Sequence, residues 1–159
     1  MRGGFIVVLF AVAGCVTLPN AKTTALSEKV KLNFTNCGDD LRYQAIHLSI
    51  PEDYTIESLR TEYQFCEYRI SLANGSILYV TSDIYNGSSL NFDNRHAIGV
   101  DSYSNARSKK DTISVGGKQE DQKHWKENIY GDYVFGYINC TDTTQLNKII
   151  YSAKQLPAQ

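Results

Sequence analysis

Alternation of apolar and polar residues with a period of two runs through much of the chain after residue 28. Residues 29–35 predict a strand with Val30, Leu32 and Phe34 facing inward. Residues 43–50 predict a second strand that ends before Pro51, because proline has no N–H to give to a ladder. We expect residues 51–59 to form a loop or one helical turn.

Asn74-Gly75 lies between two strand patterns, residues 63–73 and 76–82. Asn-Gly favours a two-residue type I′ turn, in which both central residues take positive φ. Such a turn would pair Leu72 with Ile77 and Ile70 with Tyr79. The sequence therefore predicts a hairpin with an apolar stripe on one face.

The second half of the domain predicts more strands and then one helix. Strand patterns occupy residues 112–115 and 124–128, and Gly116-Gly117 is expected to end the first of them. Residues 133–140 are apolar at successive positions, which is typical of a central strand covered on both faces. The triplet Thr141-Asp142-Thr143 offers a helix N-cap, and the apolar positions that follow have helical spacing: Leu146, Ile149, Ile150 and Ala153.

These elements predict an α+β fold, an antiparallel sheet of about six to eight strands with a C-terminal amphipathic helix packed on it. The Ile50-Pro51 strand end, the central hairpin and the Leu-x-x-Ile-Ile-x-Ser pattern of residues 146–152 look like the sandwich of photosystem oxygen-evolving proteins and their nuclear-transport relatives. That resemblance implies a fold and transfers no function.

The N-terminus has the pattern of an export signal. Arg2 precedes an apolar run at residues 5–13, which is too short to span a bilayer. The run ends in Val12-Ala13-Gly14-Cys15, which resembles the lipobox of bacterial lipoproteins. The resemblance implies that residues 1–14 are a signal peptide, that Cys15 carries the lipid, and that the membrane is a partner through it. An ordinary secretory signal cleaved after Cys15 or Ala21 is the alternative.

Residues 15–28 then form a lipidated tether, and residues 29–159 form a single soluble domain. The small, polar composition of the tether is typical of a spacer. Val16 follows the lipidated position, where an Asp often signals inner-membrane retention in Gram-negative lipoproteins, so the resemblance favours the cell outer membrane. The domain would lie in the periplasm or on the cell surface.

Four glycosylation sequons support a competing interpretation, a eukaryotic secreted glycoprotein. They begin at Asn33, Asn74, Asn86 and Asn139. Chance explains such triplets in a chain rich in Asn, Ser and Thr, and two of the four coincide with Asn-Gly turns. We therefore favour the bacterial interpretation.

Charge narrows the choice of partners. The chain has 17 acidic and 16 basic residues, with 21% charged and 42% hydrophobic residues overall. No basic excess is present to attract nucleic acid, so we expect no nucleic-acid partner.

The cysteines beyond Cys15 are Cys37, Cys66 and Cys140. An odd number in an oxidising compartment leaves one thiol after one bridge. Cys37 and Cys140 both lie at the ends of predicted strands next to turn residues, and they are the preferred pair. Cys66 shares a strand face with Tyr68, Ile70 and Leu72, so it suits a small buried hydrophobe as readily as a bridge.

No pattern for catalysis stands out. Histidine pairs with zinc spacing, a Gly-rich phosphate loop, a calcium loop and Gly-x-Ser-x-Gly are all absent from the sequence, so we expect no metal and no cofactor. Residues 93–96, Asp-Asn-Arg-His, are the best catalytic candidates, but solvated loop polarity explains them more simply.

Aromatic residues in predicted loops and turns are the candidates for partner contact, because rigid rings dominate binding hot spots. The alternative is that most of them pack on the sheet. The candidates are Tyr85, Phe92, Tyr103, Trp125 and Tyr130.

Two function classes follow. The first is a lipid-anchored, noncatalytic envelope protein that binds another envelope protein or a cell-wall component through loops at residues 83–95 and 102–110. The second is a secreted enzyme inhibitor, or an enzyme whose site is assembled only in three dimensions. The anchor and the absence of a catalytic set favour the first.

Overall fold

A computed structural model of the chain describes residues 28–37, 41, 43–61, 63–90 and 113–157. The described residues form nine strands and one helix: β1 (Glu28–Asn33), β2 (Tyr43–Ile50), β3 (Tyr54–Arg60), β4 (Cys66–Leu72), β5 (Ile77–Thr81), β6 (Ile113–Lys118), β7 (His124–Tyr130), β8 (Tyr133–Cys140), α2 (Thr143–Tyr151) and β9 (Lys154–Pro157). In this part of the chain, no helix has the length and apolar character needed to cross a bilayer.

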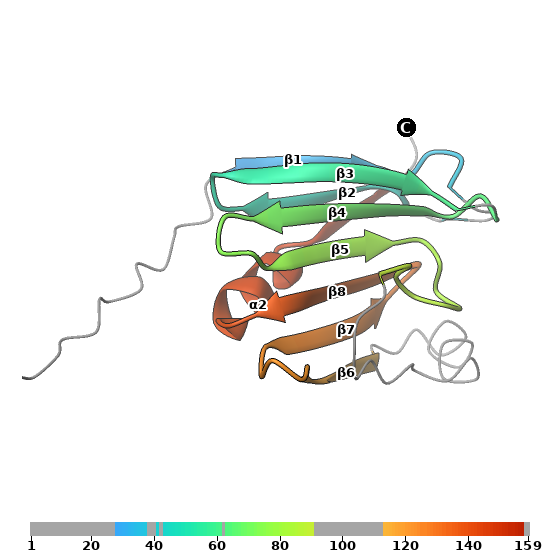
Figure 1. Cartoon of the computed structure of the whole chain (residues 1–159). Coiled ribbons are helices and arrows are strands. Elements are labelled where there is room, and N and C mark those ends of the chain that lie inside the picture. Colours follow the sequence, from blue (N-terminus) through green and yellow to red (C-terminus); the bar gives the residue numbers. More distant parts are fainter. Residues whose placement is uncertain (1–27, 38–40, 42, 62, 91–112, 158–159) are drawn as a thin grey trace, which may run out of the picture.

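Two antiparallel sheets form two layers (Figure 1). The larger has the order β3-β4-β5-β8-β7-β6, and the smaller has the order β1-β2-β9. Helix α2 contacts both β2 and β8, so it lies in the same layer as the smaller sheet and covers part of the larger one. The fold is therefore mostly antiparallel β with one short C-terminal helix packed against strands, as the sequence predicts.

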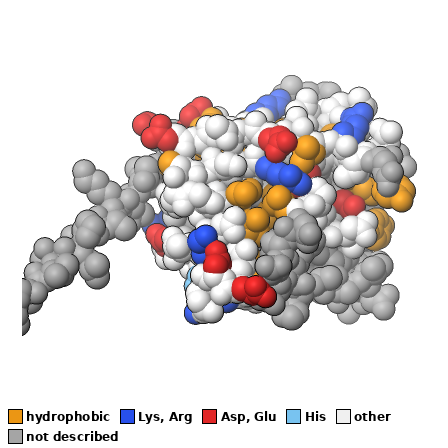
Figure 2. Space-filling model, viewed as in Figure 1, with side chains coloured by type: hydrophobic (Ala, Val, Ile, Leu, Met, Phe, Trp, Pro, Cys, Tyr) orange, Lys and Arg blue, Asp and Glu red, His pale blue; other side chains and the backbone are white. Residues whose placement is uncertain are grey.

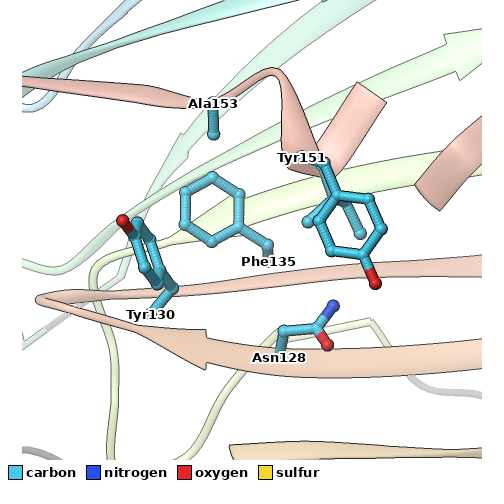
Figure 3. A pocket seen from close by; sticks show the side chains of 6 residues that line it. Asn128, Tyr130, Phe135, Tyr151 and Ala153 are labelled. Carbon is cyan, nitrogen blue, oxygen red and sulfur yellow. The ribbon is translucent and has the colours of Figure 1, made fainter. Parts of the chain in front are cut away.

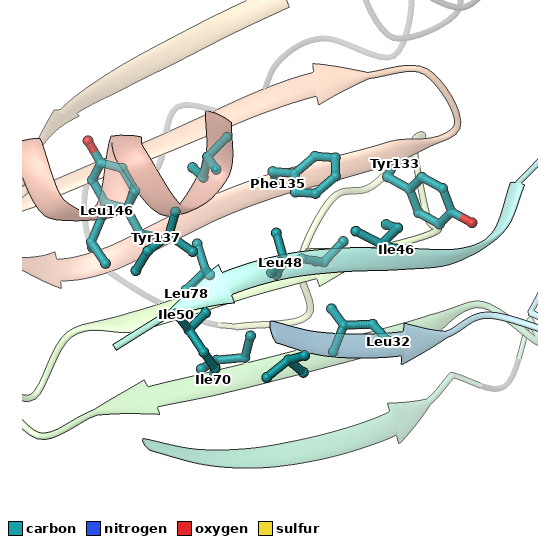
Figure 4. Packing of buried hydrophobic residues seen from close by; sticks show 14 of the residues in the cluster. Leu32, Ile46, Leu48, Ile50, Ile70, Leu78, Tyr133, Phe135, Tyr137 and Leu146 are labelled. Carbon is teal, nitrogen blue, oxygen red and sulfur yellow. The ribbon is translucent and has the colours of Figure 1, made fainter. Parts of the chain in front are cut away.

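The main core lies between the layers (Figure 4). Val30, Leu32 and Phe34 are all buried, which confirms the inward face predicted for the first strand. They meet apolar side chains from β2, from the larger sheet and from α2, including Ile46, Leu48, Ile50, Ile70, Leu78, Phe135 and Leu146. Burial of this shared apolar surface stabilises the pairing of the two layers.

Local signals account for the helix and for the central strand. The Asp142 carboxylate accepts a hydrogen bond from the Thr144 N–H at 2.9 Å and caps α2, which confirms an N-cap within residues 141–143. Leu146, Ile149 and Ile150 are buried on the sheet side. Strand β8 lies between β5 and β7 and is buried along nearly its whole length, which confirms its central position.

The hairpin around Asn74-Gly75 is present, but its predicted register is wrong by one residue. Ile70 pairs with Leu78, and Ser71 pairs with Ile77. The Gly75 N–H donates to the Leu72 carbonyl at 2.9 Å, and of the Asn-Gly pair only Gly75 has positive φ, at 80°. A three-residue loop of this kind combines a type I turn with a left-handed glycine, which shifts the strand pairing relative to a type I′ turn.

Two other expectations are corrected, and the structure adds a strand that the sequence pattern did not predict. Residues 54–60 form edge strand β3 instead of a loop or helical turn, and most of its side chains are exposed, so its hydrophobic pattern is weak. Gly116-Gly117 lies inside β6, where a Cβ on Gly116 would come within 2.9 Å of the Trp125 carbonyl oxygen. Strand β9 follows the helix and ends at Pro157, a position that an edge strand tolerates.

The predicted Cys37–Cys140 pairing is also wrong. Cys37 bonds to Cys66, with the two Cα atoms 5.2 Å apart, and joins the turn after β1 to the first residue of β4. The bridge therefore links the two layers. Cys140 is fully buried and free, because its inward position at the end of β8 places it in the main core.

Candidate ligand site between strand β7 and helix α2

The two faces of β7 differ in what covers them. Trp125, Glu127 and Ile129 are buried on the outer face of the larger sheet. Alternation places Lys126, Asn128 and Tyr130 on the inner face, toward α2. The Lys126 ammonium reaches the helix and donates to Asn147 Oδ1 at 3.2 Å. The inner-face residues of β7 therefore form one wall of a space whose other wall is α2.

A hollow of about 220 Å³ occupies this space beside the C-terminal end of α2. Figure 3 shows Tyr130 and Tyr151 on either side of Phe135, with Ala153 above and Asn128 below. Phe135 and Ile150 are buried, whereas Tyr130 is 51% and Tyr151 75% exposed. The hollow thus has an apolar floor between two accessible aromatic rings.

Asn128 supplies the polar group of the hollow. Its side chain is 5% exposed, and Nδ2 has no hydrogen-bond acceptor among the described residues. An unsatisfied buried donor carries a desolvation penalty of about 1–3 kcal/mol. Such groups are rare in native proteins and require an explanation, and a ligand that brings a hydrogen-bond acceptor would supply one.

A second, more open hollow of about 370 Å³ lies beside the first, toward the start of α2. Its lining includes polar side chains from three elements, among them Lys118, His124, Thr143 and Asn147. Lys126 lines this hollow, and its ammonium also lies 5.9 Å from the ring centroid of Tyr151, which lines the first. The two hollows are therefore neighbours on either side of Lys126.

The predicted partner-contact residues are separated in the structure. Tyr130 lines the first hollow. Trp125 is only 2% exposed, because its ring packs under Gly117 of β6, so it is a core residue and not a surface contact. Tyr85 is 39% exposed, follows β5 and lines neither hollow. Phe92 and Tyr103 lie outside the described residues, as do Cys15 and residues 93–96.

The first half of the predicted partner-binding loop is held against the sheet by a buried carboxylate. Glu67 is 1% exposed and accepts hydrogen bonds from the Ser89 N–H at 2.7 Å, from Ser88 Oγ at 3.0 Å and from Arg69 Nε at 2.7 Å. Ionic and amide donors together stabilise a carboxylate in a buried position. Glu67 thus positions residues 88 and 89 and has a structural role.

A second buried carboxylate lies further along the same face. Tyr79 Oη donates to Glu127 Oε1 at 2.7 Å, and both residues are fully buried. The Tyr79 ring occupies the space that a side chain on Gly136 would need, since a Cβ there would lie 2.2 Å from the ring. Tyr79 and Glu127 therefore form a hydrogen-bonded polar pair within the outer face of the sheet.

Neither thiol nor metal chemistry is supported in the described part of the chain. Burial raises the pKa of the Cys140 thiol to about 11, so the group stays protonated at neutral pH. Within the described ranges, no group of three or more His, Cys, Asp or Glu residues is placed to hold a metal ion.

Sequence reasoning missed Asn128 and Tyr151, two of the residues that distinguish the first hollow. Asn128 precedes Tyr130 by two positions on a strand, so the two share a face, and that spacing was the available signal. Tyr151 falls outside the apolar stripe of the helix and is exposed for that reason.

Comparison of the chain with protein families, with curated proteins and with solved structures finds no match.

Proposed function

We propose that the chain is an exported bacterial lipoprotein, anchored by lipid on Cys15, whose noncatalytic domain binds a cell-envelope component in the first hollow between β7 and α2. The observation that carries the binding role is the buried, unpaired amide donor of Asn128 beneath two accessible tyrosines. A few fixed polar groups in a mostly apolar hollow are typical of ligand sites.

Two sequence features and one contact support the export and anchoring part of the proposal. Residues 5–13 have the length of a signal-peptide apolar segment, and Val12-Ala13-Gly14-Cys15 follows it directly. The Cys37–Cys66 disulfide suits an oxidising compartment such as the periplasm. Two or more acyl chains on Cys15 would make attachment stable without an apolar patch on the domain.

The charge distribution agrees with an envelope role more than with nucleic-acid binding. Acidic and basic side chains alternate over the face in Figure 2, and the described residues on that face form no extended field of one sign. A nucleic-acid surface would need clustered Lys and Arg.

The anchor is tested by intact mass spectrometry of the protein from the membrane fraction of its native cells, beside a Cys15→Ser variant. We expect a chain that begins at Cys15 and carries several acyl groups, and we expect the variant to lose them. A chain without acyl groups that carries glycans on Asn33, Asn74, Asn86 or Asn139 would overturn the bacterial interpretation.

The binding role is tested by sedimentation of the detergent-solubilised full chain with purified envelope fragments. Tyr151→Ala should reduce the bound fraction severalfold, because it removes one wall of the hollow. Tyr63→Ala is the matched control, since Tyr63 is 71% exposed and does not line this hollow. Equal binding by the wild-type chain and by Tyr151→Ala would show that the hollow is not the binding site.

A further inference from the structure

We propose that the ligand of this site is a saccharide chain bearing acetamido groups, with one acetamido carbonyl accepting a hydrogen bond from Asn128 Nδ2. The inference rests on the proposed binding function and names its ligand class. It is carried by four features of the site: which groups are free to recognise a ligand, the shape of the apolar surface, the type of the unpaired polar group, and the charge of the lining.

Recognition by β7 must come from its side chains. Strand β7 is hydrogen-bonded to β6 on one side and to β8 on the other, so its backbone has no open edge at this site. A peptide that binds by adding a strand needs such an edge. Ligands that rely on aromatic faces and single polar contacts fit the site better.

The apolar surface suits a ring with flat faces. Tyr130 and Tyr151 stand on either side of Phe135, and the Tyr130 and Phe135 rings are tilted by 58° with their centroids 6.5 Å apart. A pyranose ring has C–H groups on its faces and polar groups at its edges. It can therefore lie against one tyrosine while its edge substituents turn toward Asn128.

The unpaired group defines what the substituent must be. Asn128 Nδ2 is a donor, so the ligand must bring an acceptor into a mostly apolar space. An acetamido group supplies a carbonyl acceptor together with a methyl group that can contact Phe135, Ile150 or Ala153. A hydroxyl at the same ring position reaches less far and adds no apolar contact.

Mobile side chains line the hollow above Asn128. Tyr151 is 75% exposed, and in Figure 3 Asn128 lies beneath it. Exposed side chains exchange rotamers within picoseconds to nanoseconds. Rotation of Tyr151 would therefore change access to the amide without any change in the backbone.

Charge excludes the deacetylated form of the same sugar. The described residues that line the two hollows include Lys118 and Lys126 but neither Asp nor Glu. The Lys126 ammonium also lies near the Tyr151 ring, where a cationic ligand would otherwise bind. A free amino sugar, which is protonated at neutral pH, would be repelled. The adjoining polar hollow leaves room for a second unit of a neutral chain.

The experiment measures the affinity of the full chain in detergent for four probes by isothermal titration calorimetry: tri-N-acetylchitotriose, its deacetylated form chitotriose, cellotriose, and the peptide N-acetyl-trialanine. We expect tri-N-acetylchitotriose to bind about tenfold or more tightly than the other three, because only it brings both the carbonyl and the ring. Asn128→Leu should remove most of its advantage over cellotriose, Tyr151→Ala should weaken both sugars, and Tyr63→Ala should change neither.

Asn128→Leu is expected to fold, because replacing an unpaired buried donor by an apolar group of similar size is close to neutral for stability. Equal affinity for tri-N-acetylchitotriose and cellotriose in the wild-type chain would overturn the inference, as would binding of the peptide alone or of none of the probes. In each of those cases, envelope sedimentation that still depends on Tyr151 would leave the binding function standing. Sedimentation that does not depend on Tyr151 would contradict both the proposed binding function and the proposed ligand class.

Discussion

The two faces of the larger sheet are stabilised in different ways. The inner face presents almost only apolar side chains to β1, β2, β9 and α2, among them Ile70, Leu78 and Phe135. The outer face buries apolar residues as well, but it also buries the carboxylates of Glu67 and Glu127, each with hydrogen-bond donors beside it. The inner face depends on area removed from water, whereas the outer face also depends on polar groups that must all stay paired.

The candidate site belongs to the inner face, at the place where its cover is incomplete. Helix α2 ends at Tyr151, and β9 begins at Lys154, so β7 is covered there by side chains only. Asn128 is a buried polar residue on this face, and its Nδ2 is unpaired, unlike the outer-face carboxylates. Glu67 and Glu127 therefore stabilise the fold, whereas the Asn128 amide is available to a ligand.

The largest effect should come from the inner face. Ile70→Ala removes a fully buried side chain and should lower the free energy of unfolding by roughly 2–5 kcal/mol. Ile56→Ala is the matched control, because Ile56 pairs directly with Ile70 across β3 and β4 but is 39% exposed. Urea unfolding that gave the same loss for both variants would contradict the assignment of the inner face as the main core.

Removal of the Cys37–Cys66 disulfide between the layers should have the second-largest effect on stability. The variant with Cys37→Ser and Cys66→Ser opens a loop with a sequence separation of 29 residues and should lose about 3–4 kcal/mol by the chain-entropy estimate. Thermal unfolding with and without reductant measures this loss. Reductant should destabilise the wild-type chain and leave the double variant unchanged, and the reverse would refute the Cys37–Cys66 pairing.

Removing the negative charge of Glu67 should destabilise the outer face of the larger sheet. Glu67→Gln keeps the shape of the side chain but turns one acceptor into a donor, so it should cost about 1–3 kcal/mol. The expected signature is local: the Ser89 amide, which donates to Glu67, should exchange with solvent much faster. Unchanged exchange at Ser89 would show that the carboxylate does not hold this loop.

The smallest effect concerns reactivity and not stability. Because burial raises the pKa of Cys140 to about 11, the thiolate fraction stays low at neutral pH and rises only in strong alkali. Iodoacetamide should not label Cys140 in the folded protein at pH 7 and should label it after unfolding in urea. Rapid labelling of the folded chain at pH 7 would contradict its buried position.

The sequence predicted most of the inner face, because the strands at its centre are rich in apolar residues and the helix follows a capping sequence. Sequence-based prediction was wrong where one local feature decides between two similar structures. One residue of loop length changed the register of the β4–β5 hairpin, and edge strand β3 has too few buried side chains to show a period. The partner of Cys37 depends on how two distant segments meet across the layers, which spacing along the chain does not encode.

The candidate site was predictable only in part. Tyr130 was identified as an aromatic residue near a turn, but its role depends on Asn128 and on the end of α2, which meet it only in the folded chain. Trp125 meets the same criterion but is buried, because its position in β7 faces the other side of the sheet. Aromatic content in a sequence therefore does not distinguish a contact residue from a core residue.

The most direct test of the central claim follows the side-chain amide of Asn128 by nuclear magnetic resonance during titration of the full chain in detergent with tri-N-acetylchitotriose. Asn128→Leu assigns the signal by its disappearance. We expect a saturable shift of the Asn128 Nδ2 resonances with smaller shifts in the backbone of Tyr151 and Tyr130. Saturable binding that leaves the Asn128 side chain unshifted would contradict it.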